Sequence, residues 1–424
     1  MSNQKKNNKV FYGWFIVFGC LMVQGSATGI FTNCNGVFMG VVPESLGVTR
    51  AAFALYTTIG GLLGQGATML YGELYRRKPD GFRIYMMASC FVCSGVIMGY
   101  SFATKVWHFY LMSGLYGCFM APLTGLSITT LINSWFVDKR SLATGIAFTG
   151  SGFTAAIMAP VVTGVVNNYG WRWGYRLLSV SGFVLMFLAI AFLICETPLK
   201  KGMMPFGFQQ QEGQAPGQLP ELVGLTRAEA LKTPSIYLLA MGFTLLSIVG
   251  MGISGHAIAH LTQVGYGNVA ATVWSMVMIV MIAGKIILGA AFDKLGSVNA
   301  AILTGFCMMM SALSLHFAGA APFMPWVFAL CFGFGYSTLT VPYSYLISEI
   351  FGTKEFSAVY SVVMTISGLG GAFASPITGA LYDIFGNYKI VWPIYVGVAL
   401  CSTALMATAS MVGRRNHYNP AAKI

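Results

Sequence analysis

Apolar segments long enough to cross a lipid bilayer follow one another along almost the whole chain. A helix of about 20 apolar residues spans the hydrocarbon core of a membrane. The chain is 56% hydrophobic and only 8% charged, so it has too few polar side chains to cover a soluble domain. The sequence therefore predicts an all-α membrane protein with twelve transmembrane helices, at roughly 11–40, 50–71, 82–101, 106–134, 141–166, 174–195, 235–264, 269–292, 297–319, 323–349, 356–382 and 389–412.

The cations of the chain are distributed unevenly over the two sides of this expected bundle. With the N-terminus inside, 18 of the 24 Lys and Arg residues lie on the inner side, five lie on the outer side, and the remaining one is Lys285. An excess of Lys and Arg in cytoplasmic loops is the positive-inside rule. We therefore attribute the net charge of +12 to membrane topology rather than to nucleic-acid binding. Both termini are expected in the cytoplasm, and the chain in the plasma or inner membrane of a cell.

Residues 196–232 interrupt the apolar pattern with a segment rich in Pro, Gly and Gln. This cytoplasmic central loop separates an N-terminal six-helix half (1–195) from a C-terminal six-helix half (233–424). The stretches "GELYRRKPDG" (72–81) and "GAAFDKLG" (289–296) echo each other at matching places, as expected for a transporter built from related halves. Near the end of the loop, Thr226 followed by Glu229 predicts the start of a short helix.

Three stretches resemble one family of membrane proteins. "GAAFDKLG" (289–296) is similar to the Gly-x-x-x-Asp-Arg/Lys-x-Gly loop of the major facilitator superfamily. "RSLATGIAFTGSGFTAAIMAPVVTGVVNNYGWR" (140–172) and "FGTKEFSAVYSVVMTISGLGGAFASPITGALYDIFGNY" (351–388) resemble the fifth and eleventh helices of its monocarboxylate and oxalate–formate branch. The resemblance spans residues 10 to 412. It implies the major facilitator fold and a secondary transporter that works by alternating access.

The resemblance has three departures. Arg76 stands where the family motif usually has Asp, which predicts a degenerate acid–base latch in the N-terminal half. No Lys or Arg occurs between Glu355 and Tyr388, where the branch often has a basic residue. The Lys found in the first helix of animal relatives is also absent from "TGIFTNCNG" (28–36).

Lys285 lies inside an otherwise uncharged run from Gly265 to Phe292. A Lys at the centre of a membrane helix costs about 2.5–3.5 kcal/mol, and no acidic residue of the apolar segments is available to neutralise it. One interpretation is that its ammonium extends to the inner interface near Asp293. The other is that a substrate carboxylate neutralises it, because the resembling branch has a substrate-binding basic residue at this place. A single cation favours one carboxylate over two.

Polar side chains on several expected helices are candidates for lining a central cavity. The first helix carries Gln24 and three candidate substrate-binding residues on one helical face, and the fourth and tenth helices add tyrosines. Such polar stripes either bind substrate or join helices by hydrogen bonds. The substrate-binding candidates besides Lys285 are Thr28, Thr32, Asn35, Tyr116, Tyr336 and Tyr343.

Charged residues at helix ends are candidates for gating. Asp293 and Lys294 form either a solvated pair or, as the resemblance implies, a latch that holds the inner side closed. Asp383 ends the eleventh expected helix in the similar context "GALYDIFG", on the opposite face of the membrane. Arg172, in the closing Gly170-Trp171-Arg172 of the fifth-helix motif, is the fourth gating candidate.

His256 and His260 lie four residues apart on one face of the seventh expected helix. They are either structural side chains or an imidazole site that couples transport to pH. No third ligand accompanies them, so we expect no metal site, and no cofactor motif or catalytic set occurs. We therefore expect that the protein is not an enzyme. We also expect that it acts as a monomer.

The sequence thus predicts a secondary transporter of a small organic anion, most consistent with a monocarboxylate, by proton symport or anion exchange. A dicarboxylate or formate-type exchanger remains an alternative for the substrate. A membrane sensor that binds the anion without moving it remains an alternative for the function, although the short loops contain no recognisable output domain.

Overall fold

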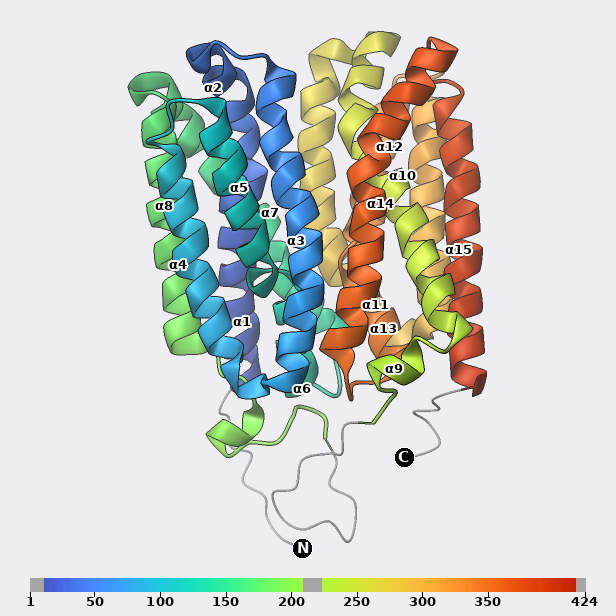
Figure 1. The fold of residues 1–424 in the computed structure, drawn as a ribbon. Helices are drawn as coiled ribbons and strands as arrows, with labels where there is room; N and C mark the ends of the chain where they lie inside the picture. Colours follow the sequence, from blue (N-terminus) through green and yellow to red (C-terminus); the bar gives the residue numbers. More distant parts are fainter. Residues whose placement is uncertain (1–10, 209–222, 417–424) are drawn as a thin grey trace, which may run out of the picture.

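The computed structural model describes residues 11–208 and 223–416, and this part of the chain is a bundle of long helices (Figure 1). Within it, the only β-type pairings are two isolated bridges, Phe136 with Phe206 and Gly224 with Gly352. The helices carry many exposed apolar side chains, such as Leu111 at 70% and Phe192 at 71% exposure. A protein in water would bury these groups, whereas a bilayer solvates them.

The helices form two groups that stand side by side in Figure 1, coloured blue to green and yellow to red. The first group contains α1 (Gly13–Gln24), α2 (Phe38–Leu46), α3 (Arg50–Arg77), α4 (Phe82–Tyr100), α5 (Val106–Met120), α6 (Gly125–Trp135), α7 (Arg140–Tyr169) and α8 (Trp171–Leu188). The second contains α10 (Pro234–Leu261), α11 (Gly267–His316), α12 (Met324–Ser337), α13 (Val341–Phe351), α14 (Phe356–Phe385) and α15 (Val391–Asn416), with the short helix α9 (Arg227–Ala230) before it.

Ten helical segments of the described residues are long and apolar enough to cross a membrane. The least apolar long helix, α3, is not among them, and the 45-residue segment Thr272–His316 counts once. That segment is interrupted at Gly296, whose φ of 74° and ψ of 165° are not helical. Because positive φ strains any residue with a Cβ, glycine is the residue suited to this sharp reversal. The all-helical membrane fold is therefore confirmed, while the count of twelve stays a prediction.

Within the described residues, three of the expected helices change conformation near their middle. The first is an α-helix only to Gln24, continues as a π-helix (η1, Gly25–Thr32), and tightens to a 3₁₀-helix (η2, Asn33–Val37). The fourth breaks at the 3₁₀ turn η4 (Ala121–Leu123), and the tenth breaks between α12 and α13. Such breaks free backbone groups in the interior of a membrane protein, where they frequently accompany functional sites.

The end of the central loop forms the short helix that the sequence predicts. Thr226 is the N-cap of α9: its hydroxyl accepts from the backbone N–H of Glu229 at 3.3 Å. The Glu229 carboxylate accepts from the backbone N–H of Thr226 at 2.7 Å, which completes a capping box. This hydrogen bond lowers the pKa of the Glu229 carboxyl. The prediction of a capped helix here is confirmed, although the helix has a single turn.

Candidate functional site

The side of the bundle on which α1 begins, α15 ends and α9 lies is called the terminal side here, and the opposite one the far side (Figure 1). The helices α7 and α14 start on the terminal side, and α3 ends there. The first part of α11 runs from the far side down to the reversal at Gly296. The two helix groups meet through α7 against α11 and through α3 against α14. These two seams hold the candidate site.

Lys285 of α11 lies in the first seam with only 4% of its surface exposed. Its Nζ donates to the carbonyl oxygen of Phe148 at 3.1 Å and to the Ser151 hydroxyl at 3.2 Å, both on α7. The Ser151 hydroxyl also donates to the Phe148 carbonyl at 3.0 Å. No salt bridge joins Lys285 to a carboxylate within the described residues. The ammonium is therefore hydrogen-bonded, but its charge is not neutralised.

The Lys285 side chain points away from the terminal side. Its backbone carbonyl lies against Gly145 of α7, whereas Nζ reaches Phe148 and Ser151, three and six residues further along that helix. At 1.5 Å per residue, the ammonium lies roughly 4 to 9 Å closer to the far side than its own backbone. A helical side chain leans toward the N-terminus of its helix, which for α11 is the far side. This geometry opposes the interpretation that the Lys285 ammonium extends toward the end of the bundle at which Asp293 lies.

Glycines let α7 and α11 approach closely enough for these bonds. A Cβ on Gly145 would overlap the Lys285 carbonyl oxygen, and one on Gly289 would lie 2.6 Å from the Ser141 carbonyl oxygen. A Cβ on Gly152 would lie 2.7 Å from Ile282. The contact is therefore backbone against backbone over several turns, the arrangement that small residues permit in membranes.

Asp293 connects the two groups at the end of the same seam. Its carboxylate oxygens accept from the backbone N–H groups of Ser141 at 3.0 Å and Leu142 at 3.1 Å, in the first turn of α7. The N-cap residue of that helix, Lys139, makes no side-chain cap. Asp293 therefore satisfies the free N–H groups of a helix in the other group, and its charge complements the helix dipole.

The other gating candidates lie elsewhere. Lys294 is exposed beside Asp293. Arg172 donates to the carbonyl oxygen of Ala103 at 3.2 Å and stacks on Trp171, so these contacts stay within the first group on the far side. Asp383 lies in the last turn of α14, and its side chain is outside the described residues. Of the four candidates, Asp293 is thus the one seen to bridge the groups.

The polar residues of the first helix are displaced from the single face that an α-helix would give them. Thr32 contacts the Tyr116 hydroxyl at 3.4 Å, and Asn35 accepts from the Tyr56 hydroxyl at 2.6 Å. Thr28 is half-buried in the π-helix. The π-helical turn rotates the residues that follow it, because each turn takes up an extra residue.

Asn33 and Ser151 are two site residues that sequence analysis missed. The Asn33 amide donates to the Ser151 carbonyl oxygen at 3.4 Å, so Asn33 belongs to the surroundings of Lys285. A strict α-helical repeat had favoured Thr32 and Asn35 instead. Ser151 had a signal, since it is a hydroxyl between the glycines of "GSG" (150–152), inside the stretch that resembles the fifth helix of the family.

The two tyrosines of the tenth expected helix are not brought to Lys285 by any contact. Tyr343 is 2% exposed, shares a hydrogen bond of 2.9 Å with Ser247, and stacks on Phe243. These contacts join helices within the second group. The half-buried Tyr336 hydroxyl lies 3.6 Å from the Met251 sulfur.

The two histidines lie in an aromatic cluster of the second group. His260 is 3% exposed, donates from Nε2 to the Leu315 carbonyl oxygen at 3.0 Å, and packs edge-on against Tyr388 and Trp392. His256 is half-buried, with Nδ1 3.0 Å from the Tyr388 hydroxyl. Among the described residues, no group of three His, Cys, Asp or Glu side chains is arranged to hold a metal ion.

Known proteins match nearly the whole chain. Residues 21–375 match the model of the Major Facilitator Superfamily. Monocarboxylate transporter 13 of Rattus norvegicus is 25% identical over 400 residues, covering 94% of this chain and 89% of the relative. Monocarboxylate transporter 4 of Gallus gallus is 22% identical over 419 residues, covering 93% of this chain and 82% of the relative.

Solved structures share the fold. The proton:xylose symporter XylE superposes with a TM-score of 0.69 at 13% identity, covering 94% of this chain and 95% of that protein. The human organic anion transporter MFSD10 superposes with a TM-score of 0.67 at 12% identity, covering 93% and 99%. At these identities the structures support the fold alone, whereas the family match covers most of the sequence. The chain therefore belongs to the major facilitator superfamily, and it is a membrane transporter rather than an enzyme.

Proposed function

We propose that this transporter moves a small organic anion, most consistent with a monocarboxylate, and that Lys285 binds its carboxylate. The observation that carries the proposal is the buried Lys285 ammonium, which is hydrogen-bonded across the seam and has no carboxylate partner in the part of the chain that the structure describes. A buried cation is costly unless a counter-ion neutralises it. The names of the relatives, monocarboxylate transporters, supply the same substrate class independently.

The remaining polar candidates are proposed to complete the cavity on the far side of Lys285. Thr28, Thr32 and Asn35 line it from the first helix, with Asn33 added from the structure. Tyr116 and Tyr336 are proposed to face it from the fourth and tenth helices. Tyr343 is proposed to support the cavity wall without contacting the substrate, because its hydroxyl is already hydrogen-bonded to Ser247 within the second group.

The contacts between the groups support an alternating-access cycle in which the present conformation is the one open on the far side. The seam contacts at Ser141, Lys285 and Asp293 all lie in the portions of α7 and α11 nearest the terminal side. The helices of the two groups also converge toward that side in Figure 1. We propose that the terminal side is cytoplasmic, so that this conformation is open to the outside. Asp293 would then release α7 when the inside opens, while Asp383, Lys294 and Arg172 stay proposed contributors to the gates.

The proposed architecture is two six-helix halves, 1–195 and 233–424, joined by the cytoplasmic central loop 196–232. Counting α3 as a span, and counting the two parts of α11 on either side of Gly296 separately, gives the twelve spans that the sequence predicts. The protein is proposed to act as a monomer in the plasma or inner membrane.

This topology gives a labelling prediction. Met203 is 38% exposed in the central loop, and Ala320 is exposed in a turn on the far side. In intact cells, a membrane-impermeant thiol reagent should label Ala320→Cys and should not label Met203→Cys until the membrane is permeabilised. Peptide mass spectrometry separates these sites from the nine native cysteines. Labelling of Met203→Cys in intact cells would reverse the proposed orientation.

Flux of labelled lactate or pyruvate into proteoliposomes is the direct test of the function. A transporter accumulates label with saturation, and either a proton gradient or an internal anion stimulates it, depending on whether the mode is symport or exchange. Binding without flux would instead identify a sensor. Stronger competition by dicarboxylates than by monocarboxylates would favour the alternative of a dicarboxylate exchanger.

For the symport mode, His256 and His260 are the proposed proton-coupling candidates, and the structure makes them unequal. His256→Gln should flatten the pH dependence of uptake, because histidine is the side chain best suited to exchange a proton at physiological pH. His260→Gln should keep that dependence and lower the thermal unfolding temperature, because loss of a buried hydrogen bond costs about 1–3 kcal/mol. An unchanged pH profile in His256→Gln assigns the proton to Lys285 or to the substrate, or excludes proton coupling.

A further inference from the structure

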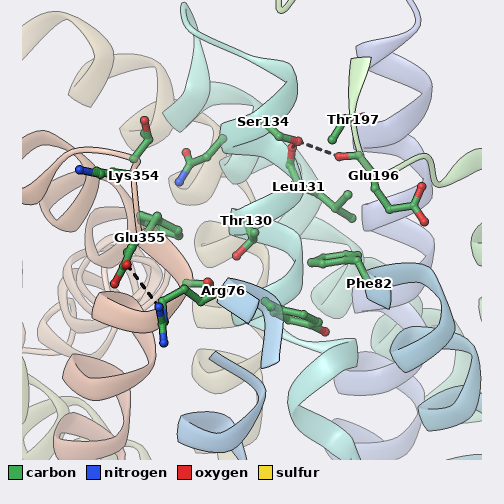
Figure 2. A pocket seen from close by; sticks show the side chains of 14 residues that line it. Arg76, Phe82, Thr130, Leu131, Ser134, Glu196, Thr197, Lys354 and Glu355 are labelled. Carbon is green, nitrogen blue, oxygen red and sulfur yellow. Dashed lines mark hydrogen bonds and ion pairs between the residues drawn. The ribbon is translucent and has the colours of Figure 1, made fainter. Parts of the chain in front are cut away.

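A cavity of about 260 Å³ lies on the terminal side, where the second seam meets the start of the central loop (Figure 2). Its walls come from the end of α3, the start of α4, the last turns of α6, the first residues of the central loop, and the start of α14 with the turn before it. Neither Lys285 nor Asp293 lines it. Because both helix groups contribute walls, the cavity keeps this shape only while the groups are together on the terminal side.

Part of the cavity wall is apolar. Phe82 of α4, Leu131 of α6 and Phe356 of α14 all line the cavity, and each side chain is buried. An apolar cavity of about 150 Å³ is enough to hold a benzene molecule. The present cavity is larger, so it has room for an aromatic ring or a branched chain together with a polar group.

The two acids of the lining already have partners. Glu196 forms a salt bridge of 3.3 Å within the central loop. Glu355 pairs with Arg76 at 3.5 Å and accepts from the backbone N–H of Arg227 at 2.9 Å. The Arg227 guanidinium in turn lies 3.6 Å from the Glu73 carboxylate, so it joins acids of both helix groups. The protein itself thus neutralises the acids beside the cavity, and they do not require a cationic ligand.

Two donors of the lining, in contrast, have no partner among the described residues. Asn133 is half-buried, and its amide nitrogen is fully buried without a hydrogen bond. Lys354 is exposed and forms no salt bridge with any described carboxylate. Figure 2 shows Lys354 beside Glu355, on the side of the cavity opposite Glu196. A buried donor without an acceptor is costly, so this lining favours a ligand that brings an acceptor with negative charge.

We propose that this cavity binds a small organic acid with an apolar body, and that the bound acid inhibits transport. The apolar body packs against Phe82, Leu131 and Phe356, while the carboxylate accepts from Asn133 and neutralises Lys354. The last side-chain torsion of an Asn is broad, so the Asn133 amide turns to present its nitrogen to the ligand.

Inhibition follows from the position of the cavity between the helix groups. A ligand that contacts both groups stabilises the conformation in which they are together on the terminal side. A transporter has to leave that conformation to complete its cycle. The inhibition therefore rests on the alternating-access cycle proposed above, whereas the binding site depends neither on the substrate nor on Lys285.

The first test measures binding of phenylacetate to the purified Lys285→Gln protein, in which the proposed substrate site has lost its cation. Phenylacetate should raise the thermal unfolding temperature with saturation, because a ligand that binds the folded state stabilises it. Phenylacetamide, which has the same ring without the charge, should give a smaller rise at equal concentration. No rise with phenylacetate, or an equal rise with the amide, would overturn the proposal.

Variants in the same background locate the site. Asn133→Leu should weaken the apparent affinity for phenylacetate about tenfold or more, as expected for a hydrogen bond to a charged group. Lys354→Gln should weaken it about two- to fivefold, the effect of losing an exposed ion pair. Lys232→Gln is the matched control, because it removes an exposed cation that does not line the cavity, and it should leave the affinity unchanged. Equal affinity in all three variants would place the ligand elsewhere.

The second test measures inhibition in proteoliposomes that contain the protein with Lys285 intact. Phenylacetate on both sides of the membrane should lower the maximal rate of lactate uptake, and Asn133→Leu should restore that rate. Inhibition that only raises the lactate concentration needed for half-maximal uptake would assign phenylacetate to the substrate site and contradict the inhibitory role. If lactate is not taken up at all, the substrate assignment fails while the binding measurement on Lys285→Gln still decides whether the cavity binds the acid.

Discussion

Lys285→Gln should abolish saturable uptake of small carboxylates while the protein still folds and inserts. The substitution removes the cation that we propose neutralises the substrate, and loss of one partner of a buried charge pair costs about 2–5 kcal/mol. At 1.4 kcal/mol per factor of ten, uptake at limiting substrate should fall by about thirtyfold or more. Folding should persist, because the variant removes an unpaired charge from a buried seam. Initial uptake rates and thermal unfolding in proteoliposomes check the two halves of the expectation.

Two control variants separate the charge of Lys285 from its hydrogen bonds. Ser151→Ala removes one acceptor of the ammonium and keeps the cation, so it should reduce uptake far less than Lys285→Gln. Lys389→Gln removes an exposed cation on the far side and should have no effect. If Lys285→Gln transports a carboxylate with the rate and affinity of the unmodified protein, the site lies elsewhere.

Substrate selectivity gives a further readout of the same residue. Lys285→Arg keeps the charge but presents a planar pair of donors, so it should retain some uptake and shift preference toward carboxylates that accept two parallel hydrogen bonds. Monocarboxylates should compete for uptake in the unmodified protein, and their uncharged amides should not. Competition by the amides would mean that substrate recognition does not depend on the charge of Lys285.

Asp293→Asn should favour the conformation that is open on the terminal side and lower turnover more than substrate affinity. An Asn has one acceptor oxygen and no charge, so it retains at most one of the two bonds to Ser141 and Leu142. Removing a helix N-cap costs about 0.5–2 kcal/mol, which corresponds to a roughly two- to thirtyfold shift of the conformational equilibrium. Exchange turnover and the thiol accessibility of Ser141→Cys measure the two effects. Ser141 suits the reporter because its hydroxyl is buried without a hydrogen-bond partner.

Lys294→Gln is the matched comparison for Asp293→Asn. The Lys294 side chain is exposed and adjacent in sequence, whereas Asp293 makes the bonds to α7. We expect normal turnover and an unaltered Ser141→Cys labelling rate in Lys294→Gln. Equal effects of the two variants would mean that Asp293 and Lys294 act as a solvated charge pair, and not through the bonds of Asp293 to α7. Unchanged turnover in Asp293→Asn would remove Asp293 from the latch.

Local sequence rules predicted those features that depend on neighbours along the chain. The capping box of Thr226 and Glu229 forms as expected, because its atoms are three residues apart and any helix start brings them together. The place of Lys285 within an apolar segment follows from the sequence, but its burial does not, because extension of its ammonium to the interface remained an open interpretation. The polar face of the first helix was not predictable, because the π-helical turn at Gly25–Thr32 changes the repeat on which that face depends.

The sequence by itself determined the membrane class, the apolar segments, the family and the presence of a cation, Lys285, inside one of those segments. These follow from hydrophobicity, charge count and spacing, which act on each segment separately. The tertiary structure alone decided that Lys285 meets Phe148 and Ser151, that Asp293 caps α7, and that Arg227 joins Glu73 to Glu355. Such contacts join residues from about 130 to 150 positions apart. They depend on which backbones pack closely enough to meet, and no spacing along the chain encodes that choice.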